Sequence, residues 1–363
     1  MEITLKKFAY VDALRGLAII GVMLAHIGGG EYLPTFLANI VNNGPLGVQL
    51  FFIVSAFTLF SSLSYRKENE KRPFVNFFIR RFFRIAPMYY LAIIYYLWQG
   101  GPSQAFWLGD ATKVTGANIA SNFLFLHGLY PYWINSVVPG GWSIAVETSF
   151  YLLLPFLFLK IKNASHALNF VIIAFIIRII FLIALRHVNP VGGEGLWTGY
   201  LYFFLPNQLP IFALGILMFF IIKEEYKPNF STPTLLLLAA LIFFNLTASS
   251  GTLPYHILYG LSFVFLGLAL SKRSYKIIVN PAICYIGKIS FSLYLIHFAV
   301  IYWLEKFGFF SPSHSFFSGN LKYALNLIVV FILSIIVSSL SYKLIELPAQ
   351  ALGKKIIKKL EAS

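Results

Sequence analysis

The sequence contains a single cysteine, Cys284, and very few charged residues for its length. One cysteine cannot form a disulfide within the chain and cannot build a cysteine-based metal site. Only 11% of the 363 residues are charged, whereas a soluble domain carries roughly a quarter. This scarcity excludes an ordinary soluble domain. The hydrophobic share of 58% and the mean hydropathy of +0.76 predict an integral membrane protein.

Signals of several other protein classes are also absent. The sequence shows no paired catalytic carboxylates, phosphate-binding glycine loop, zinc-ligand spacing or internal repeat. The net charge is +15, but most basic residues lie between hydrophobic segments, so the charge gives no reason to expect a nucleic-acid partner. The N-terminal hydrophobic run lacks a small-residue cleavage site and is interrupted by Arg15. It is therefore interpreted as the first transmembrane helix and not as a signal peptide.

Ten hydrophobic segments predict an all-α, polytopic membrane protein. They cover residues 8–27, 45–63, 85–99, 143–160, 168–186, 198–222, 232–248, 254–270, 282–304 and 321–345. With a cytoplasmic N-terminus, the inner segments hold 20 of the 28 Lys and Arg and the outer segments hold four. The positive-inside rule therefore predicts that both termini are cytoplasmic. Residues 1–350 are expected to form one transmembrane domain, and residues 351–363 a short basic tail on the inner leaflet.

The first span carries three polar residues on one face. On an ideal helix, Asp12, Arg15 and His26 fall within about 60° of one another, and Arg15 and His26 are about 16 Å apart along the axis. Asp12 and Arg15 are three residues apart, so they can pair and lower the cost of burying the guanidinium. His26 is a candidate general base. A structural ion pair and an interfacial histidine remain open as alternatives.

Two further groups of polar residues lie at the ends of predicted spans. Arg81 and Arg84 share a face at i,i+3 and suit an anionic cofactor, although plain positive-inside charge explains them equally well. Ser143, Glu147 and Tyr151 form one stripe at the start of the fourth span. The spacing of its carboxylate does not fit a capping box, so helix capping is a poor explanation. The longest outer segment, 100–142, is rich in Gly, Pro and aromatic residues and is a candidate for a site mouth.

Other polar side chains complete a predicted polar interior. They are Gln49 and Ser55 in the second span, Ser290, Tyr294 and His297 in the ninth, and Asn207 and Gln208 between Pro206 and Pro210 in the sixth. The ninth-span residues share one face of the helix. The position of His297 along the span places it inside the bilayer. A proline-broken span normally lines an enclosed cavity, although small-residue helix packing explains the serines equally well. His26 and His297 are the strong general-base candidates in this interior.

Together these motifs resemble the acyltransferase-3 family of integral-membrane acyltransferases, which O-acylate surface polysaccharides and related bacterial envelope glycans. The matching pieces, in family order, are Asp12-Ala13-Leu14-Arg15-Gly16 with His26, Gly47 to Ser55, Arg81 to Pro87, Trp142 to Glu147, Ser290 to His297, and Glu346-Leu347-Pro348. Each piece is weak alone, but the set covers nearly the whole chain and is specific. The chain departs from the family at Ala56, where glycine is usual, and residues 351–363 are too few for the C-terminal esterase-like domain that some members carry.

The resemblance implies an acyl-CoA donor, usually acetyl-CoA, and an acceptor hydroxyl on a lipid-linked or envelope glycan, in a bacterial inner or plasma membrane. It implies that His26 is the base, oriented by Glu147 or a neighbouring polar group. His297 is expected in the same catalytic set, and Arg15 contacts the donor together with Arg81 and Arg84. Substrate contacts are expected from Asp12, Gln49, Ser55, Trp142, Ser143 and Tyr294. No metal is expected, and an acyl-histidine intermediate remains an alternative to direct transfer.

Two rival functions remain open at this point. A transporter or flippase would also use polar helix faces, a proline-broken helix and membrane histidines, but the chain has no inverted repeat. A non-enzymatic scaffold would not need both histidines to face the interior.

Overall fold

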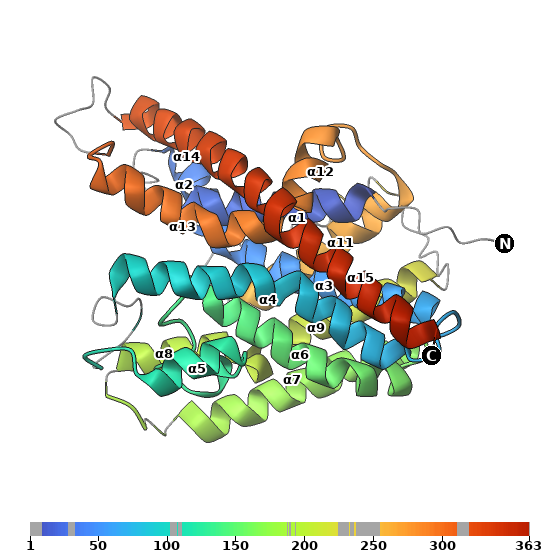
Figure 1. The fold of residues 1–363 in the computed structure, drawn as a ribbon. Helices are drawn as coiled ribbons and strands as arrows, with labels where there is room; N and C mark the ends of the chain where they lie inside the picture. The colour runs from blue at the N-terminus through green and yellow to red at the C-terminus, as the bar shows by residue number, and fades with distance from the viewer. Residues whose placement is uncertain are drawn as a thin grey trace. The chain divides into compact units, whose positions relative to one another are not determined.

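The computed structural model of the chain describes residues 9–27, 33–101, 111–186, 194–223, 255–310 and 319–362, with a few isolated positions between these ranges. All regular elements in the described residues are helices, which confirms the predicted all-α class (Figure 1). The chain divides into two compact units. The first consists of Met1–Ser55 and Met218–Leu340, and the second of Ala56–Leu217 and Ser341–Ser363.

The first unit is organised around α1 (Ala9–His26). Its other elements are α2 (Thr35–Asn42), η2 (Gly44–Leu46), the start of α3 (Gly47–Arg66), the end of α9 (Leu205–Lys223), α11 (Tyr255–Lys272), α12 (Pro281–Lys288), α13 (Ser290–Lys306) and α14 (Gly319–Ser341). Helix α1 packs against η2, α11, α12 and α13, so the helix with the predicted catalytic residues contacts several other elements of this unit.

Glycines allow α1 and α12 to approach at backbone distance. A Cβ atom at Gly287 of α12 would collide with the main-chain carbonyl of Asp12, and one at Gly16 would collide with the carbonyl of Ile283. Small residues at such crossings are how membrane helices gain close van der Waals packing. The glycine in the Asp12-to-Gly16 motif therefore has a packing role that fixes α12 beside the Asp12–Arg15 turn.

The second unit contains most of the remaining helices. They are α4 (Pro73–Gly100), α5 (Gly116–Phe123), η3 (His127–Leu129), α6 (Gly141–Lys160), α7 (Ala164–Arg186), α8 (Glu194–Phe203), most of α9, the π-helix η5 (Tyr342–Glu346) and α15 (Leu347–Ala362). Residues 351–362, expected as a basic tail, belong to α15. This helix packs against α4 (Figure 1), and the Glu361 carboxylate accepts hydrogen bonds from the backbone N–H groups of Lys71 and Arg72 at the start of α4.

Within the described residues, seven helical segments are long and apolar enough to cross a membrane, and the bent pair α12–α13 would make eight. Helix α7 buries only 17% of its apolar window inside the protein, as expected for a lipid-facing helix. The chain is thus a multi-pass membrane protein. The predicted span 85–99 belongs to the longer α4, which is not among the seven, and the predicted span 232–248 lies outside the described residues. Ten spans and cytoplasmic termini stay predictions.

Two predicted spans are interrupted in the structure, so that each consists of two helices. The ninth is broken at Ile289, where α12 and α13 meet at 79°. The sixth is broken at Phe204, before Pro206, and both prolines lie within α9. The side-chain amides of Asn207 and Gln208 donate hydrogen bonds to the Tyr202 carbonyl near the end of α8, at 2.8 and 2.7 Å. These amides thus bond to the backbone at the break between α8 and α9, and a cavity lined by this break stays a prediction.

Candidate functional site

The two histidines singled out from the sequence meet in the first unit. His26 is the last residue of α1, and His297 lies in the second turn of α13. His26 Nδ1 is 3.2 Å from His297 Nε2, and His297 is fully buried. The ring of Phe298 packs against both imidazoles, with centroid distances of 4.5 and 4.1 Å. An apolar ring thus shields a direct histidine–histidine hydrogen bond.

The hydrogen bonds of His297 assign the protons of the pair. His297 Nδ1 is 3.1 Å from the carbonyl oxygen of Leu293, which can only accept, so Nδ1 carries the hydrogen. In a neutral ring Nε2 then has a lone pair and accepts from His26 Nδ1–H. The remaining nitrogen of His26, Nε2, has its own lone pair. This arrangement presents a basic nitrogen at the end of α1, as general-base chemistry requires.

The predicted ion pair of α1 is also present. The Arg15 guanidinium lies 3.6 Å from the Asp12 carboxylate, with 24% and 17% of the two side chains exposed. This confirms that the i,i+3 spacing brings the two groups together. The pair lies on the turn of α1 that contacts α12 through Gly16 and Gly287, and His26 lies at the opposite end of the same helix.

One of the residues predicted to contact the substrate, Tyr294, lies beside the histidine pair. Tyr294 packs one turn before His297, with ring centroids 6.1 Å apart, and meets the edge of Phe51 from α3. Gln49 is buried near the start of α3, and Ser55 is partly buried one and a half turns later. The first unit therefore brings together Tyr294 and the two histidines.

Arg81 and Arg84 lie on α4 in the second unit, and Arg81 interacts with residues of α6. Arg81 donates a hydrogen bond to the hydroxyl of Tyr151 and interacts electrostatically with Glu147 and Arg84. The carboxylate of Glu147, which helix capping does not explain, thus has an arginine beside it. Arg81 therefore has one carboxylate, that of Glu147, and one further guanidinium, that of Arg84, near it, so this cluster keeps a net positive charge. Contact between Glu147 and His26, which lie in different units, stays a prediction.

The neighbouring Arg80 belongs to a different network. Its guanidinium donates two hydrogen bonds to the Glu70 carboxylate, which also accepts from Arg66 and Asn76. Burial alone would raise the pKa of Glu70, but these hydrogen bonds outweigh it and hold the pKa below its usual value. The charge of Arg80 is therefore balanced by the Glu70 carboxylate. Arg81 and Arg84 together carry one more charge than the Glu147 carboxylate can balance.

The start of α6 is held by a buried network that sequence reasoning missed. Tyr89 donates a hydrogen bond to Asn122 at 2.9 Å, and its oxygen lies 3.0 Å from Nε2 of His127. The same nitrogen lies 3.0 Å from the carbonyl of Gly141, the first residue of α6. Burial lowers the pKa of His127 to about 4, so the ring is neutral near pH 7. The available signal was a histidine and several asparagines in the segment 100–142, which is otherwise rich in aromatic residues.

The predicted residues Trp142 and Ser143 belong to this same helix start. Trp142 stacks on Phe203 of α8, with ring centroids 4.5 Å apart, and the Ser143 hydroxyl donates to the carbonyl of Gly140. Both side chains are buried. They fix the start of α6, and Glu147 and Tyr151 of this helix interact with Arg81.

Sequence comparison places this set of motifs in one family. A family model described as "Acyltransferase domain" matches residues 8–343. Over 97% of its length the chain is 26% identical to a Staphylococcus aureus (strain COL) protein named "Putative O-acetyltransferase SACOL0978". Over 95% it is 22% identical to O-acetyltransferase OatA of Staphylococcus aureus (strain NCTC 8325 / PS 47). The chain spans 59% and 57% of the length of these relatives. It belongs to the acyltransferase-3 family.

Proposed function

We propose that this protein is a membrane O-acyltransferase that moves an acetyl group from acetyl-CoA to a hydroxyl of a glycan or lipid-linked saccharide. The family and the names of the relatives support the reaction class. The observation that carries the proposal is the hydrogen bond between His26 and His297. This hydrogen bond orients the His26 ring without water or a carboxylate. It leaves Nε2 of His26 as a basic nitrogen at the end of an apolar helix.

In the proposed reaction, Nε2 of His26 takes the proton of the acceptor hydroxyl while that oxygen attacks the thioester carbonyl. The carbon–sulfur bond then breaks, and the thiolate of coenzyme A takes the proton from the His26 imidazolium. The products are an O-acetyl ester and free coenzyme A. His297 stabilises the imidazolium because its Nε2 accepts the hydrogen bond from Nδ1 of His26. An acetyl-histidine intermediate is the alternative route.

The donor is proposed to bind through Arg81 and Arg84. Coenzyme A is rich in phosphate, and arginine forms paired hydrogen bonds to phosphate oxygens. The cluster with Glu147 has two guanidinium groups for one carboxylate, so an anion improves its charge balance. Arg15 is proposed as a further donor contact, with its position set by Asp12.

A direct test uses the purified full chain in lipid nanodiscs with acetyl-labelled acetyl-CoA. The proposal predicts protein-dependent transfer of label to an envelope glycan extract, released by mild alkali as expected of an ester. Longer acyl-CoA donors in the same assay define the acyl group. A transporter would instead move labelled saccharide across vesicles and leave the thioester intact. That result would overturn the proposed function.

A further inference from the structure

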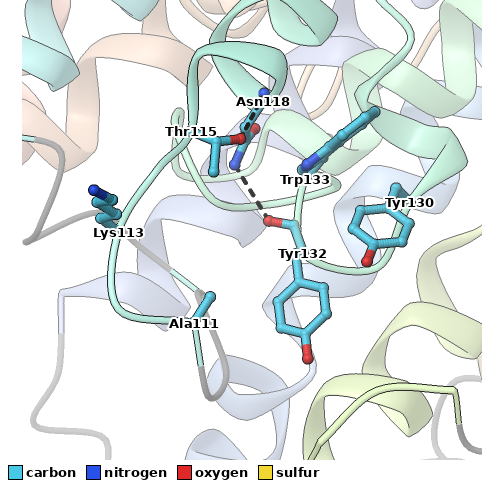
Figure 2. Close-up of a pocket in the computed structure, with 7 residues that line it drawn as sticks. All are labelled: Ala111, Lys113, Thr115, Asn118, Tyr130, Tyr132 and Trp133. Atoms are coloured by element: carbon cyan, nitrogen blue, oxygen red, sulfur yellow. Dashed lines mark hydrogen bonds between the residues drawn. The ribbon is translucent and has the colours of Figure 1, made fainter.

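A pocket of about 330 Å³ lies in the outer segment of the second unit, between residues 111 and 133. Such a volume is at the lower end of the range of roughly 300–1,000 Å³ found for small-molecule sites. Figure 2 shows the aromatic side chains of Tyr130, Tyr132 and Trp133 across the pocket from Lys113. No step of the proposed reaction uses this pocket.

The aromatic wall has a fixed concave form. The ring of Tyr130 meets Trp133 edge-on, with centroids 4.9 Å apart and an interplanar angle of 63°. It is tilted by 41° to the ring of Tyr132, at 5.6 Å. The hydroxyl of Tyr132 accepts a hydrogen bond from the backbone N–H of Gly192. The wall thus consists of apolar ring faces set at angles, with their orientation maintained by contacts among themselves and with the α8 side of the unit.

Polar groups form the opposite side and the floor. The Asn118 side chain donates hydrogen bonds to the Ser136 hydroxyl and to the Tyr132 carbonyl, so the floor is rigid. The Thr115 hydroxyl oxygen accepts from the backbone N–H of Asn118, which leaves its own hydrogen available to a ligand. Lys113 is exposed and adds an ammonium group at the rim. Hydrogen-bond donors therefore face the aromatic wall.

We infer that this pocket binds one sugar ring of the acceptor glycan, an inference that rests on the proposed function. A pyranose ring has apolar C–H faces and hydroxyls around its edge. Aromatic faces pack against the former, and hydroxyl and ammonium donors bind the latter. A purely apolar ligand would leave Lys113 and Thr115 unused, and a compact anion would leave the three rings unused. Only an amphipathic ring uses both sides of this pocket.

The pocket is also connected to the helix that carries Glu147. Asn122 donates to the side-chain and backbone oxygens of Asn118, and Asn122 accepts from Tyr89 in the network that ends at the carbonyl of Gly141. A continuous series of hydrogen bonds thus joins the pocket floor to the first residue of α6. Binding of a sugar here would hold the acceptor against a part of the fold that is rigidly linked to this helix.

The test compares acceptor dependence with donor hydrolysis in nanodisc-embedded full-length protein. Trp133→Ala and Tyr130→Ala should raise the half-saturating concentration of envelope glycan extract by about tenfold, the equivalent of ~1.4 kcal/mol of lost ring packing. Hydrolysis of acetyl-CoA without acceptor should not change. Tyr130→Phe, which keeps the ring face, and Leu129→Ala, at an exposed neighbour outside the pocket, are matched controls. An unchanged acceptor curve in both alanine variants would overturn the inference.

A second measurement separates this inference from the proposed function. Saturation-transfer NMR with maltotetraose, chitotetraose and tetragalacturonate detects weak sugar binding without any reaction. At least one of these probes should give a signal that Trp133→Ala removes and Tyr130→Phe retains. If wild-type protein neither hydrolyses nor transfers acetyl groups, the proposed function fails, while such a signal still supports a sugar pocket. If no probe gives a Trp133-dependent signal, the sugar pocket is refuted.

Discussion

The histidine pair makes a quantitative prediction about His297. In the proposed mechanism His297 does not touch substrate but accepts a hydrogen bond from the His26 imidazolium, at the 3.2 Å separation seen in the structure. A hydrogen bond to a charged group contributes about 1.5–3 kcal/mol. Losing it in the transition state should lower kcat by roughly 10- to 150-fold, because each 1.36 kcal/mol corresponds to a factor of ten. His297→Ala should therefore be impaired but measurably active.

Conservative variants separate positioning from a purely structural role. The amide oxygen of His297→Gln reaches the place of Nε2 and can accept from His26 Nδ1, so kcat should recover to within a few-fold of wild type. His297→Asn is too short to do so and should behave like His297→Ala. The Michaelis constant for acetyl-CoA should be unchanged in all three, because His297 is not one of the proposed donor contacts, which are Arg15, Arg81 and Arg84.

The assay is steady-state acetyl transfer in nanodiscs, with the melting temperature of each variant as the control for folding. The reasoning would be refuted by wild-type kcat in His297→Ala, since the hydrogen bond would then contribute nothing to the reaction. It would also be refuted by equal loss of kcat in the Gln and Ala variants with equal loss of thermal stability, because that pattern indicates packing alone.

Three further predictions concern other parts of the molecule. Replacing Arg81 and Arg84 together by Gln should raise the Michaelis constant for acetyl-CoA at least tenfold with little change in kcat; inverted membrane insertion of the mutant would mean that they are only positional charge. Gly287→Ala should lower the melting temperature because its Cβ meets an α1 carbonyl, whereas Gly195→Ala, with open space around it, should not; equal stability would contradict the packing argument. Because burial lowers the pKa of His127 to about 4, the unfolded chain takes up a proton that the folded chain does not. Stability should fall as pH decreases from about 6.5 towards 4, by up to about 3 kcal/mol, and His127→Gln should flatten this dependence in thermal-shift assays.

Local geometry was predictable from the sequence where neighbours in one helix determine it. The Asp12–Arg15 pair follows from i,i+3 spacing and is present. The all-helical class and most helix positions follow from runs of apolar residues, because the bilayer requires backbone hydrogen bonds to be satisfied within the segment.

Contacts between distant segments were not predictable in the same way. His26 and His297 are 271 residues apart, and helix periodicity gives their faces but not their partners. Hydropathy indicates neither the 79° bend at Ile289 nor the close approach of Gly287 to the backbone of α1. The His127 network was missed because a polar residue in an outer segment is expected to meet water, and only the fold reveals that it is fully buried.

The most direct test of the account is acetyl transfer by His26→Ala, with His166→Ala as the matched histidine control on the exposed surface of α7. Loss of a positioned base typically lowers the rate by about 10²–10⁴-fold, while alanine favours the helix itself. The account predicts a loss of this size for His26→Ala and normal activity for His166→Ala, at equal amounts of membrane-inserted protein. Normal acetyl transfer by His26→Ala would contradict the account.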